Sequence, residues 1–224
     1  MAMEAASPDF AVRAPARVDL PEQSLAVACV LTMSGGFLDA FTWLSLGGVF
    51  GNSQTGNVVF FGMNVAVGNW REAAHHVPPI LAFLTGAWVA SRAKAPLLCL
   101  VGEIAALAAV LALLLMHRLP GPLAITGISF GVALQTASFR QVEHWKYISV
   151  TVTGNFLRAI DQLTSNADRE AAHGARTMIA VCLMFLLGAI VGGGLTVRLG
   201  AISLIFPISL LVSALWLCRP LRFR

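Results

Sequence analysis

Charged residues are scarce in this chain. Asp, Glu, Lys and Arg make up 12% of its 224 residues, hydrophobic residues make up 57%, and the mean hydropathy is +0.77. These values lie outside the range of an ordinary soluble domain, and the charges avoid long stretches of the chain. We therefore expect an all-α integral membrane protein whose main partner is the lipid bilayer. The formal net charge of +4 is modest and lies in loops and tails, so no nucleic-acid partner is predicted.

Catalytic and metal-binding signatures are also missing. The P-loop, GxGxxG and HExxH patterns are absent and no nucleophile–base pair is visible, so we expect no enzyme activity and no cofactor. The pair His75-His76 has no further ligands at a suitable spacing, so no metal site is expected there. Neither disulfides nor a zinc site is predicted by the four cysteines, which lie in apolar runs without CxxC spacing: Cys29, Cys99, Cys182 and Cys218.

What the sequence does contain is an internal repeat. The polar stretch Gly51–Asn57 ends in Thr-Gly-Asn and returns in the second half as Ser149–Asn155. Downstream, Phe83–Val89 returns as Phe185–Val191 with five of seven residues identical. Upstream, three positions with the spacing i, i+4, i+7 also correspond: Gly35, Asp39 and Thr42 with Gly131, Gln135 and Ser138. Self-similarity of this kind indicates a duplicated structural unit.

Six apolar runs are long enough, or nearly so, to cross a bilayer, which takes about 20 helical residues. They are Leu25–Phe50, Val77–Ser91, Pro96–Met116, Gly121–Ser138, Thr177–Val197 and Ala201–Leu217. A unit with three crossings makes its second copy enter from the opposite side, so we expect about six transmembrane helices in a 3+3 inverted repeat. Residues 55–68 and 148–163 are mildly apolar, and we expect broken or half helices there, at the two Thr-Gly-Asn motifs.

This division sets the domain boundaries and the orientation. The membrane repeats are residues 24–118 and 119–218, between a disordered cytoplasmic tail (1–23) and a basic cytoplasmic tail (219–224). With six spans, 12 of the 15 Lys and Arg residues fall on the side of both termini, and counting the half helices as full spans would weaken this asymmetry. The positive-inside rule therefore predicts a bacterial inner-membrane protein with N- and C-termini in the cytoplasm. Six spans are few for alternating access, which makes a homodimer a candidate assembly.

The two Thr-Gly-Asn triplets are the first candidate site. Thr favours a helix N-cap, Gly allows close backbone approach, and Asn offers donors and an acceptor. A half helix that begins there would present free N–H groups and a positive dipole end to a polar or anionic solute. The alternative is a repeated helix cap that only shapes the fold. The candidate solute-binding residues are Thr55, Gly56, Asn57, Thr153, Gly154 and Asn155.

Asp39 lies deep in the first apolar run. A lone carboxylate at the bilayer centre costs about 2.5–3.5 kcal/mol on insertion scales, so it should face the bundle interior and find partners. Asp39 is therefore a candidate for solute binding and for proton coupling. Gln135, its polar but non-titratable repeat counterpart, is a further candidate for solute binding. The alternative is a structural Asp39 that is hydrogen-bonded to a neighbouring helix.

Two further charged residues are secondary candidates. Glu103 lies in the third apolar run, and the simplest expectation is a snorkelling ion pair with Arg92 or Lys94. Arg158 follows the second triplet and is expected to pair with Asp161 at the spacing i, i+3, or else to face the pocket.

These motifs resemble those of the YoaK-like bacterial transmembrane proteins, a family catalogued as a domain of unknown function. The resemblance rests on Gly36–Ala40, on Gly48–Phe50 leading to the first triplet, and on Gly131 to Gln135 leading to the second. It covers residues 25–217. In that family the second triplet often ends in another residue, so the resemblance assigns Asn155 no role. It implies a membrane location and this architecture, and it implies no substrate.

The hypothesis that these observations favour is a transporter or permease for a small polar or anionic solute, with proton coupling through Asp39 as an option. One alternative is a passive channel in which Asp39 is structural and the triplets line a constriction. Another is a membrane interaction or scaffold protein without transport. The sequence names no solute and no direction of transport.

Overall fold

The computed structural model describes residues 20–165 and 169–219. Within them the chain is all-α apart from one two-stranded hairpin. The elements in chain order are η1 (Pro21–Gln23), α1 (Leu25–Ser45), α2 (Gln54–Ala66), α3 (Trp70–His75), α4 (Val77–Ala93), α5 (Pro96–Leu115), α6 (Gly121–Ser138), β1 (Gln141–Val142), β2 (Trp145–Lys146), α7 (Thr153–Ser165), α8 (Arg169–Leu199), η2 (Gly200–Leu204) and α9 (Ile205–Leu217). The expected tails, 1–23 and 219–224, lie outside the described residues except for positions 20–23 and 219.

Local chemistry explains several helix boundaries. Ser24 caps α1, because its Oγ accepts a hydrogen bond from the Val27 N–H at 3.3 Å. Helices α4, α5 and α6 each carry proline in the first turn, where a missing N–H removes no helical bond. Helix α1 ends at Ser45, short of the predicted Phe50, because Gly47 and Gly48 adopt φ values of +87° and +72° and turn the chain.

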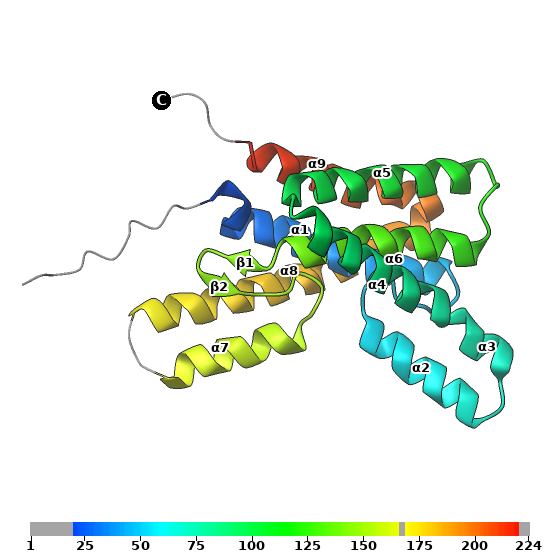
Figure 1. Ribbon diagram of the computed structural model, residues 1–224, viewed down its shortest axis with the longest axis horizontal. Coiled ribbons are helices and arrows are strands. Elements are labelled where there is room, and N and C mark those ends of the chain that lie inside the picture. The colour runs from blue at the N-terminus through cyan, green and yellow to red at the C-terminus, as the bar shows by residue number, and fades with distance from the viewer. Residues whose placement is uncertain (1–19, 166–168, 220–224) are drawn as a thin grey trace, which may run out of the picture.

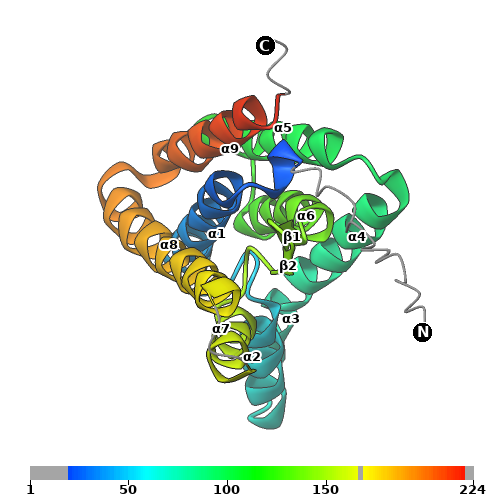
Figure 2. The same ribbon diagram turned by 90° about the vertical axis from the view of Figure 1, so that its left-hand side faces the viewer.

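Two helices form the centre of the bundle and four surround them. Figure 2 shows α1 and α6 in the middle, with α4, α5, α9 and α8 around them. The largest buried cluster joins residues from the two central helices with residues from α5 and α9, including Phe37, Leu107, Ile125 and Leu211. Phe37 also stacks on Phe206 of α9, with ring centroids 5.4 Å apart.

The closest helix pairs join the first half of the chain to the second. Helix α1 packs most extensively on α8, and α4 packs most extensively on α6. A Cβ on Gly36 of α1 would overlap the carbonyl of Phe185 on α8, and a Cβ on Gly188 would overlap the carbonyl of Met33. Glycine at these positions therefore lets the two backbones touch.

Three stretches of the described chain are long and apolar enough to cross a membrane: Leu25–Ser45, Pro96–Leu115 and Arg169–Leu217. The last has 49 residues, and Gly200, with φ +56°, and η2 turn it back so that α8 and α9 run in opposite directions (Figure 1). The predicted runs that begin at Thr177 and Ala201 are therefore α8 from Arg169 and α9 from Ile205. Helices of this length and composition are compatible with insertion into a membrane.

Helices α2 and α7 are the two short helices predicted near the Thr-Gly-Asn motifs. Each has 13 residues, about 20 Å of helix, which is less than the 30 Å hydrocarbon core of a bilayer. Figure 1 shows that both begin near the middle of the molecule and run toward opposite ends of its long axis, and Figure 2 places both on the same side of the bundle. Within the predicted stretch 148–163, α7 begins at Thr153 of the triplet, and residues 148–152 belong to a loop.

Candidate functional site

Two loops meet beside the middle of α1. Loop A, residues 46–53, joins α1 to α2, and loop B, residues 139–152, contains the hairpin and joins α6 to α7. A Cβ built on Gly35 of α1 would lie 3.4 Å from Nδ2 of Asn52 in loop A and 3.5 Å from the carbonyl oxygen of Ser149 in loop B. Both loops therefore turn back from the ends of the long helices to the same region, where helices surround them (Figure 2).

Asn57 and Asn155 hold the two loops by the same hydrogen bonds. The Asn57 side chain accepts from the Phe50 N–H at 3.0 Å and donates to the Phe50 carbonyl at 2.8 Å. The Asn155 side chain accepts from the Ile148 N–H at 3.3 Å and donates to the Ile148 carbonyl at 2.9 Å. Both side chains are fully buried, and each Nδ2 makes a second bond to an oxygen of its own half. The two asparagines thus satisfy backbone groups that a buried loop would otherwise leave unpaired.

The other triplet residues lie in the first turns of α2 and α7: Thr55, Gly56, Thr153 and Gly154. The N-cap position of α2 is occupied by Ser53, so the expectation that Thr55 caps this helix is wrong. A Cβ on Gly56 would lie 2.7 Å from the ring of Phe50, so glycine lets loop A lie against α2. Arg158 donates to the Gly154 carbonyl at 2.9 Å and makes no ion pair with Asp161 in the described part of the chain.

Asp39 fastens loop A to α1. Its carboxylate accepts from the Asn52 N–H at 2.9 Å, from the Ser53 N–H at 3.4 Å and from the Ser53 hydroxyl. Asn52 in turn donates from Nδ2 to the Gly35 carbonyl at 2.8 Å. The loop thereby supplies the donors that a carboxylate requires when apolar helices bury it. Asp39 is 5% exposed.

Gln135, the repeat counterpart of Asp39, fastens loop B and brings in an acid from another helix. In the orientation that satisfies both ends of its amide, Gln135 donates to the two Glu103 carboxylate oxygens at 3.0 and 3.3 Å. The amide oxygen then accepts from the Ser149 hydroxyl at 2.9 Å. We prefer this orientation to the reverse one, which would place the amide oxygen against the carboxylate. Each loop is thus joined to a buried carboxylate, directly through Asp39 or indirectly through Gln135.

The expected snorkelling pair of Glu103 with Arg92 or Lys94 is wrong. Glu103 is fully buried on the face of α5 that packs against α6. Gly131 makes room there, because a Cβ on Gly131 would lie only 3.5 Å from Cγ of Glu103. Arg92 instead lies over the ring of Trp88, 5.4 Å from its centroid. Glu103 is therefore hydrogen-bonded to Gln135 inside the bundle.

Three residues of the site were not among the predicted site residues: Asn52, Ser53 and Ser149. They are small polar residues within the two repeated stretches, Gly51–Asn57 and Ser149–Asn155. Asn52 and Ser149 are at most 3% exposed. The signal that could have identified them is their polarity, since polar residues between apolar runs need internal partners.

Two cavities adjoin the loops. The acidic cavity, of about 420 Å³, is lined by Asp39, Ala40, Trp43, Leu44, Phe50, Ser53, Phe185 and Ala189. The basic cavity, of about 690 Å³, is lined by Glu22, Gln23, Phe83, Ala87, Pro96, Thr136, Ala137, Ser138, Phe139, Arg140, Gln141, Lys146, Tyr147, Ile148 and Arg158.

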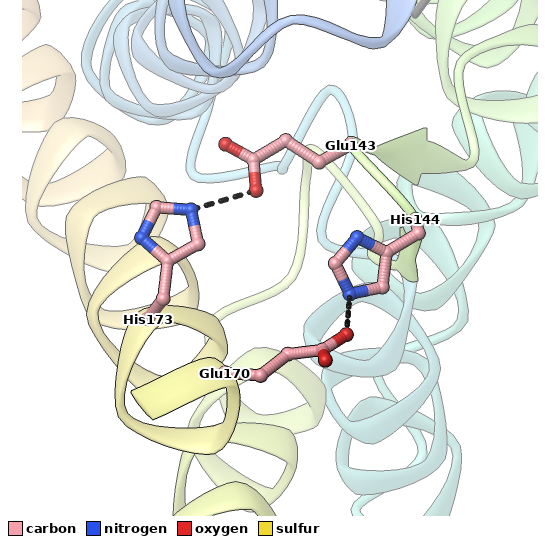
Figure 3. Close-up of polar contacts among 4 residues, drawn as sticks. All are labelled: Glu143, His144, Glu170 and His173. Atoms are coloured by element: carbon pink, nitrogen blue, oxygen red, sulfur yellow. Dashed lines mark hydrogen bonds and ion pairs between the residues drawn. The ribbon is translucent and has the colours of Figure 1, made fainter. Parts of the chain in front are cut away.

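Two histidine–glutamate contacts attach the hairpin to α8. Nε2 of His173 lies 2.9 Å from Oε2 of Glu143, and Nε2 of His144 lies 3.1 Å from Oε1 of Glu170 (Figure 3). The indole ring of Trp145 packs against α8 at Gly174, where an added Cβ would lie 2.8 Å from the ring. The contacts join the turn of the hairpin to the first turns of α8.

Helix α6 also contains the pattern Gly127-Ile128-Ser129-Phe130-Gly131, which has the G-x-S-x-G form of a hydrolase nucleophile elbow. That motif requires a sharp turn between a strand and a helix, with the serine exposed at the turn. Ser129 instead lies within a continuous helix, is fully buried, and its hydroxyl has no hydrogen-bond partner in the described chain. The pattern therefore carries no catalytic geometry.

Comparison with known proteins gives one match. The family model described as "Protein of unknown function (DUF1275)" matches residues 27–217. No curated protein and no solved structure matches the chain. The family match covers loop A, loop B and nearly the whole of the chain from α1 to α9.

Proposed function

Because the chain belongs to the DUF1275 family, whose function is unknown, we propose its function from geometry: a multi-pass membrane transporter for a small polar or anionic solute. The observation that carries this proposal is the pair of irregular, polar loops inside a bundle of apolar helices. Non-helical backbone at membrane depth is tolerated only where protein buries it or where it lines a water-filled cavity. Discontinuous helices with polar breaks near the midplane are a recurring design of substrate sites in secondary transporters.

The proposed architecture is a 3+3 inverted repeat. Helices α1, α4 and α5 form the first unit, α6, α8 and α9 form the second, and α2 and α7 re-enter as half helices. The exchange of partners supports this assignment, because the first helix of each unit packs on the second helix of the other. The opposite directions of α2 and α7 support it as well (Figure 1). The first residues of α1 and the last of α9 lie at one end of the bundle (Figure 1), and the positive-inside rule predicts that this end faces the cytoplasm of a bacterial inner membrane.

Asp39 is the proposed coupling residue. It lines the acidic cavity and at the same time holds loop A through three donors. A change in its protonation would remove an acceptor from this network and would release loop A from α1. The asparagines of the two triplets position the loops, while solute contact falls to the residues around them.

The proposal is tested by ligand-induced stabilisation followed by flux. The purified protein is melted against small anions, amino acids, sugars and nucleobases at two pH values, because a ligand of the folded state raises the melting temperature. A compound that binds is then offered to proteoliposomes with and without a proton gradient. We expect uptake that depends on the gradient and is lost in Asp39→Asn. Uptake that persists without the gradient and in Asp39→Asn would indicate a passive channel, and binding without uptake would contradict transport.

A further inference from the structure

The acidic and basic cavities occupy equivalent places in the two halves of the chain. Six of the eight residues that line the acidic cavity have their repeat counterparts in the wall of the basic cavity. The pairs are Ala40 with Thr136, Trp43 with Phe139, Leu44 with Arg140, Phe50 with Ile148, Phe185 with Phe83, and Ala189 with Ala87. The two cavities therefore occur at equivalent positions of the repeat. The differences between their lining residues indicate what each cavity can hold.

In the first half, aromatic rings fill this place. Trp43 stacks on Phe50, with centroids 4.8 Å apart, and Phe60 of α2 lies 5.4 Å from Trp43. In the second half, the position of Phe60 after the Thr-Gly-Asn triplet is taken by Arg158, and Phe50 is replaced by the smaller Ile148. The aromatic cluster is lost, and the cavity grows from about 420 to about 690 Å³.

The larger cavity carries an excess of positive charge. Arg140, Lys146 and Arg158 line it, against a single carboxylate, Glu22. No ion pair joins any of these four side chains to another residue in the described part of the chain. One guanidinium nitrogen of Arg158 donates a hydrogen bond to the Gly154 carbonyl, so the other N–H groups are available to a ligand. Cations without an ion-pair partner that line a partly open cavity are suited to an oxyanion.

Part of the remaining wall is apolar, and part is formed by neutral polar side chains. Phe83, Ala87, Phe139 and Ile148 line the apolar part, and a volume of 690 Å³ falls within the range of small-molecule sites. We propose that the basic cavity binds the carboxylate or phosphate group of a small molecule with an apolar body, held by Arg140, Lys146 and Arg158. This inference names the solute class of the transporter proposed above and so rests on that function. The same oxyanion could be offered by a soluble solute or by the headgroup of an anionic lipid.

The test measures binding without requiring transport. The protein is placed in phosphatidylcholine nanodiscs, and its melting temperature is followed as benzoate or phenyl phosphate is added, with neutral benzamide as the matched control. We expect both anions to stabilise the protein and benzamide to have no effect. In Arg140→Gln/Lys146→Gln the apparent affinity should fall about tenfold or more, because each charge-assisted hydrogen bond is worth that factor. Arg176→Gln, which removes an exposed charge outside the cavity, should bind as the wild type does.

A second arm separates the two sources of the anion. Nanodiscs that contain phosphatidylglycerol should stabilise the wild type no more than the double variant if the ligand is a soluble solute. If a lipid headgroup occupies the cavity, phosphatidylglycerol will stabilise only the wild type and will reduce benzoate binding. The proposal is overturned if none of the three anions stabilises the wild type, if benzamide matches benzoate, or if the double variant binds as Arg176→Gln does.

These results also separate the cavity from the transport function. Uptake of a solute by the double variant at the wild-type rate would leave transport in place and would contradict the cavity assignment. Anion binding that the double variant loses, without uptake of any anion, would keep the cavity and would contradict transport. The arginine and lysine side chains are exposed or half-buried, so the variants should fold, and the comparison of benzoate with benzamide needs no variant.

Discussion

Loop A and loop B are held by the same kind of asparagine contact but differ in how they connect to a buried carboxylate. In both, an asparagine of the following half helix holds the N–H and the carbonyl of a single loop residue. Loop A then bonds directly to the carboxylate of Asp39, whereas loop B reaches Glu103 through Gln135. The comparison shows that the backbone clamp is the common requirement of the fold, and that the surrounding charges and rings are what the two halves vary.

The largest effect is expected where the halves touch each other. Gly188→Leu would drive a side chain into the Met33 carbonyl of α1, so we expect loss of the folded, monodisperse protein on gel filtration in detergent. Gly193→Leu on the same helix is the matched control, because nothing lies within 4 Å of its Cβ position. Equal behaviour of the two variants would contradict the close packing of α1 on α8.

The asparagine clamps test whether the two loops are equivalent. Asn57→Ala and Asn155→Ala each leave a buried N–H and a buried carbonyl unpaired, at about 1–3 kcal/mol per group. We expect similar, large decreases in melting temperature for both. Asn64→Ala, which removes only a bond to the Phe60 carbonyl in its own helix, should have a small effect. A tolerated Asn155→Ala would break the comparison, because the second clamp would then be dispensable.

The buried acids test where the halves differ. Asp39→Asn keeps an amide oxygen for the Asn52 and Ser53 N–H groups, but it removes the negative charge and turns an NH2 toward the Ser53 hydroxyl. We expect about 1–3 kcal/mol of destabilisation. Glu103→Gln should cost less, because the Gln135 amide can rotate to pair with either an acid or an amide. Thermal unfolding in detergent at neutral pH measures both. A larger loss of stability for Glu103→Gln than for Asp39→Asn would contradict this expected order.

His76 gives the first half a pH dependence. Burial lowers the pKa of its imidazole, with the neighbouring His75 adding to the effect, so the folded state favours the neutral form. The unfolded chain binds the proton near pH 6.5, so stability is complete above that pH and declines as the pH falls toward the lower folded value. Melting curves from pH 8 to pH 5.5 should show this loss, and His76→Phe, which can still stack on Phe60, should reduce it. The exposed His117→Asn should leave the curve unchanged.

The smallest effect belongs to the hairpin of loop B. Glu143→Gln removes one carboxylate of the two contacts in Figure 3, and its partner His173 is more than half exposed. Such surface pairs contribute about 0–1 kcal/mol, so the melting temperature should change little and the change should vanish at high salt. A large loss would mean that the hairpin, and not the Asn155 clamp, holds loop B.

The sequence was sufficient to predict the helical fold and a short helix beginning at or near each triplet, because apolar runs and repeated polar triplets are local signals. It did not predict the partner of Glu103, since a helix–helix contact depends on which face of α5 meets α6. It also did not reveal that the amides of Asn57 and Asn155 bond to their own loops. The basic cavity depends on Arg140, Lys146 and Arg158, which come from separate segments. Only the folded chain brings them together.

The exchange of helices between the halves has a consequence for synthesis. The main partners of α1 are α8 and α9, and the main partner of α4 and of α5 is α6. When the first half of the chain has left the ribosome, these three helices therefore have no lasting neighbours among themselves. If the chain is inserted as proposed, Gly36 and Gly86 lack their helix partners until the second half arrives. The chain should therefore reach its final structure late, and a truncated first half should be degraded in cells and not accumulate as a stable intermediate.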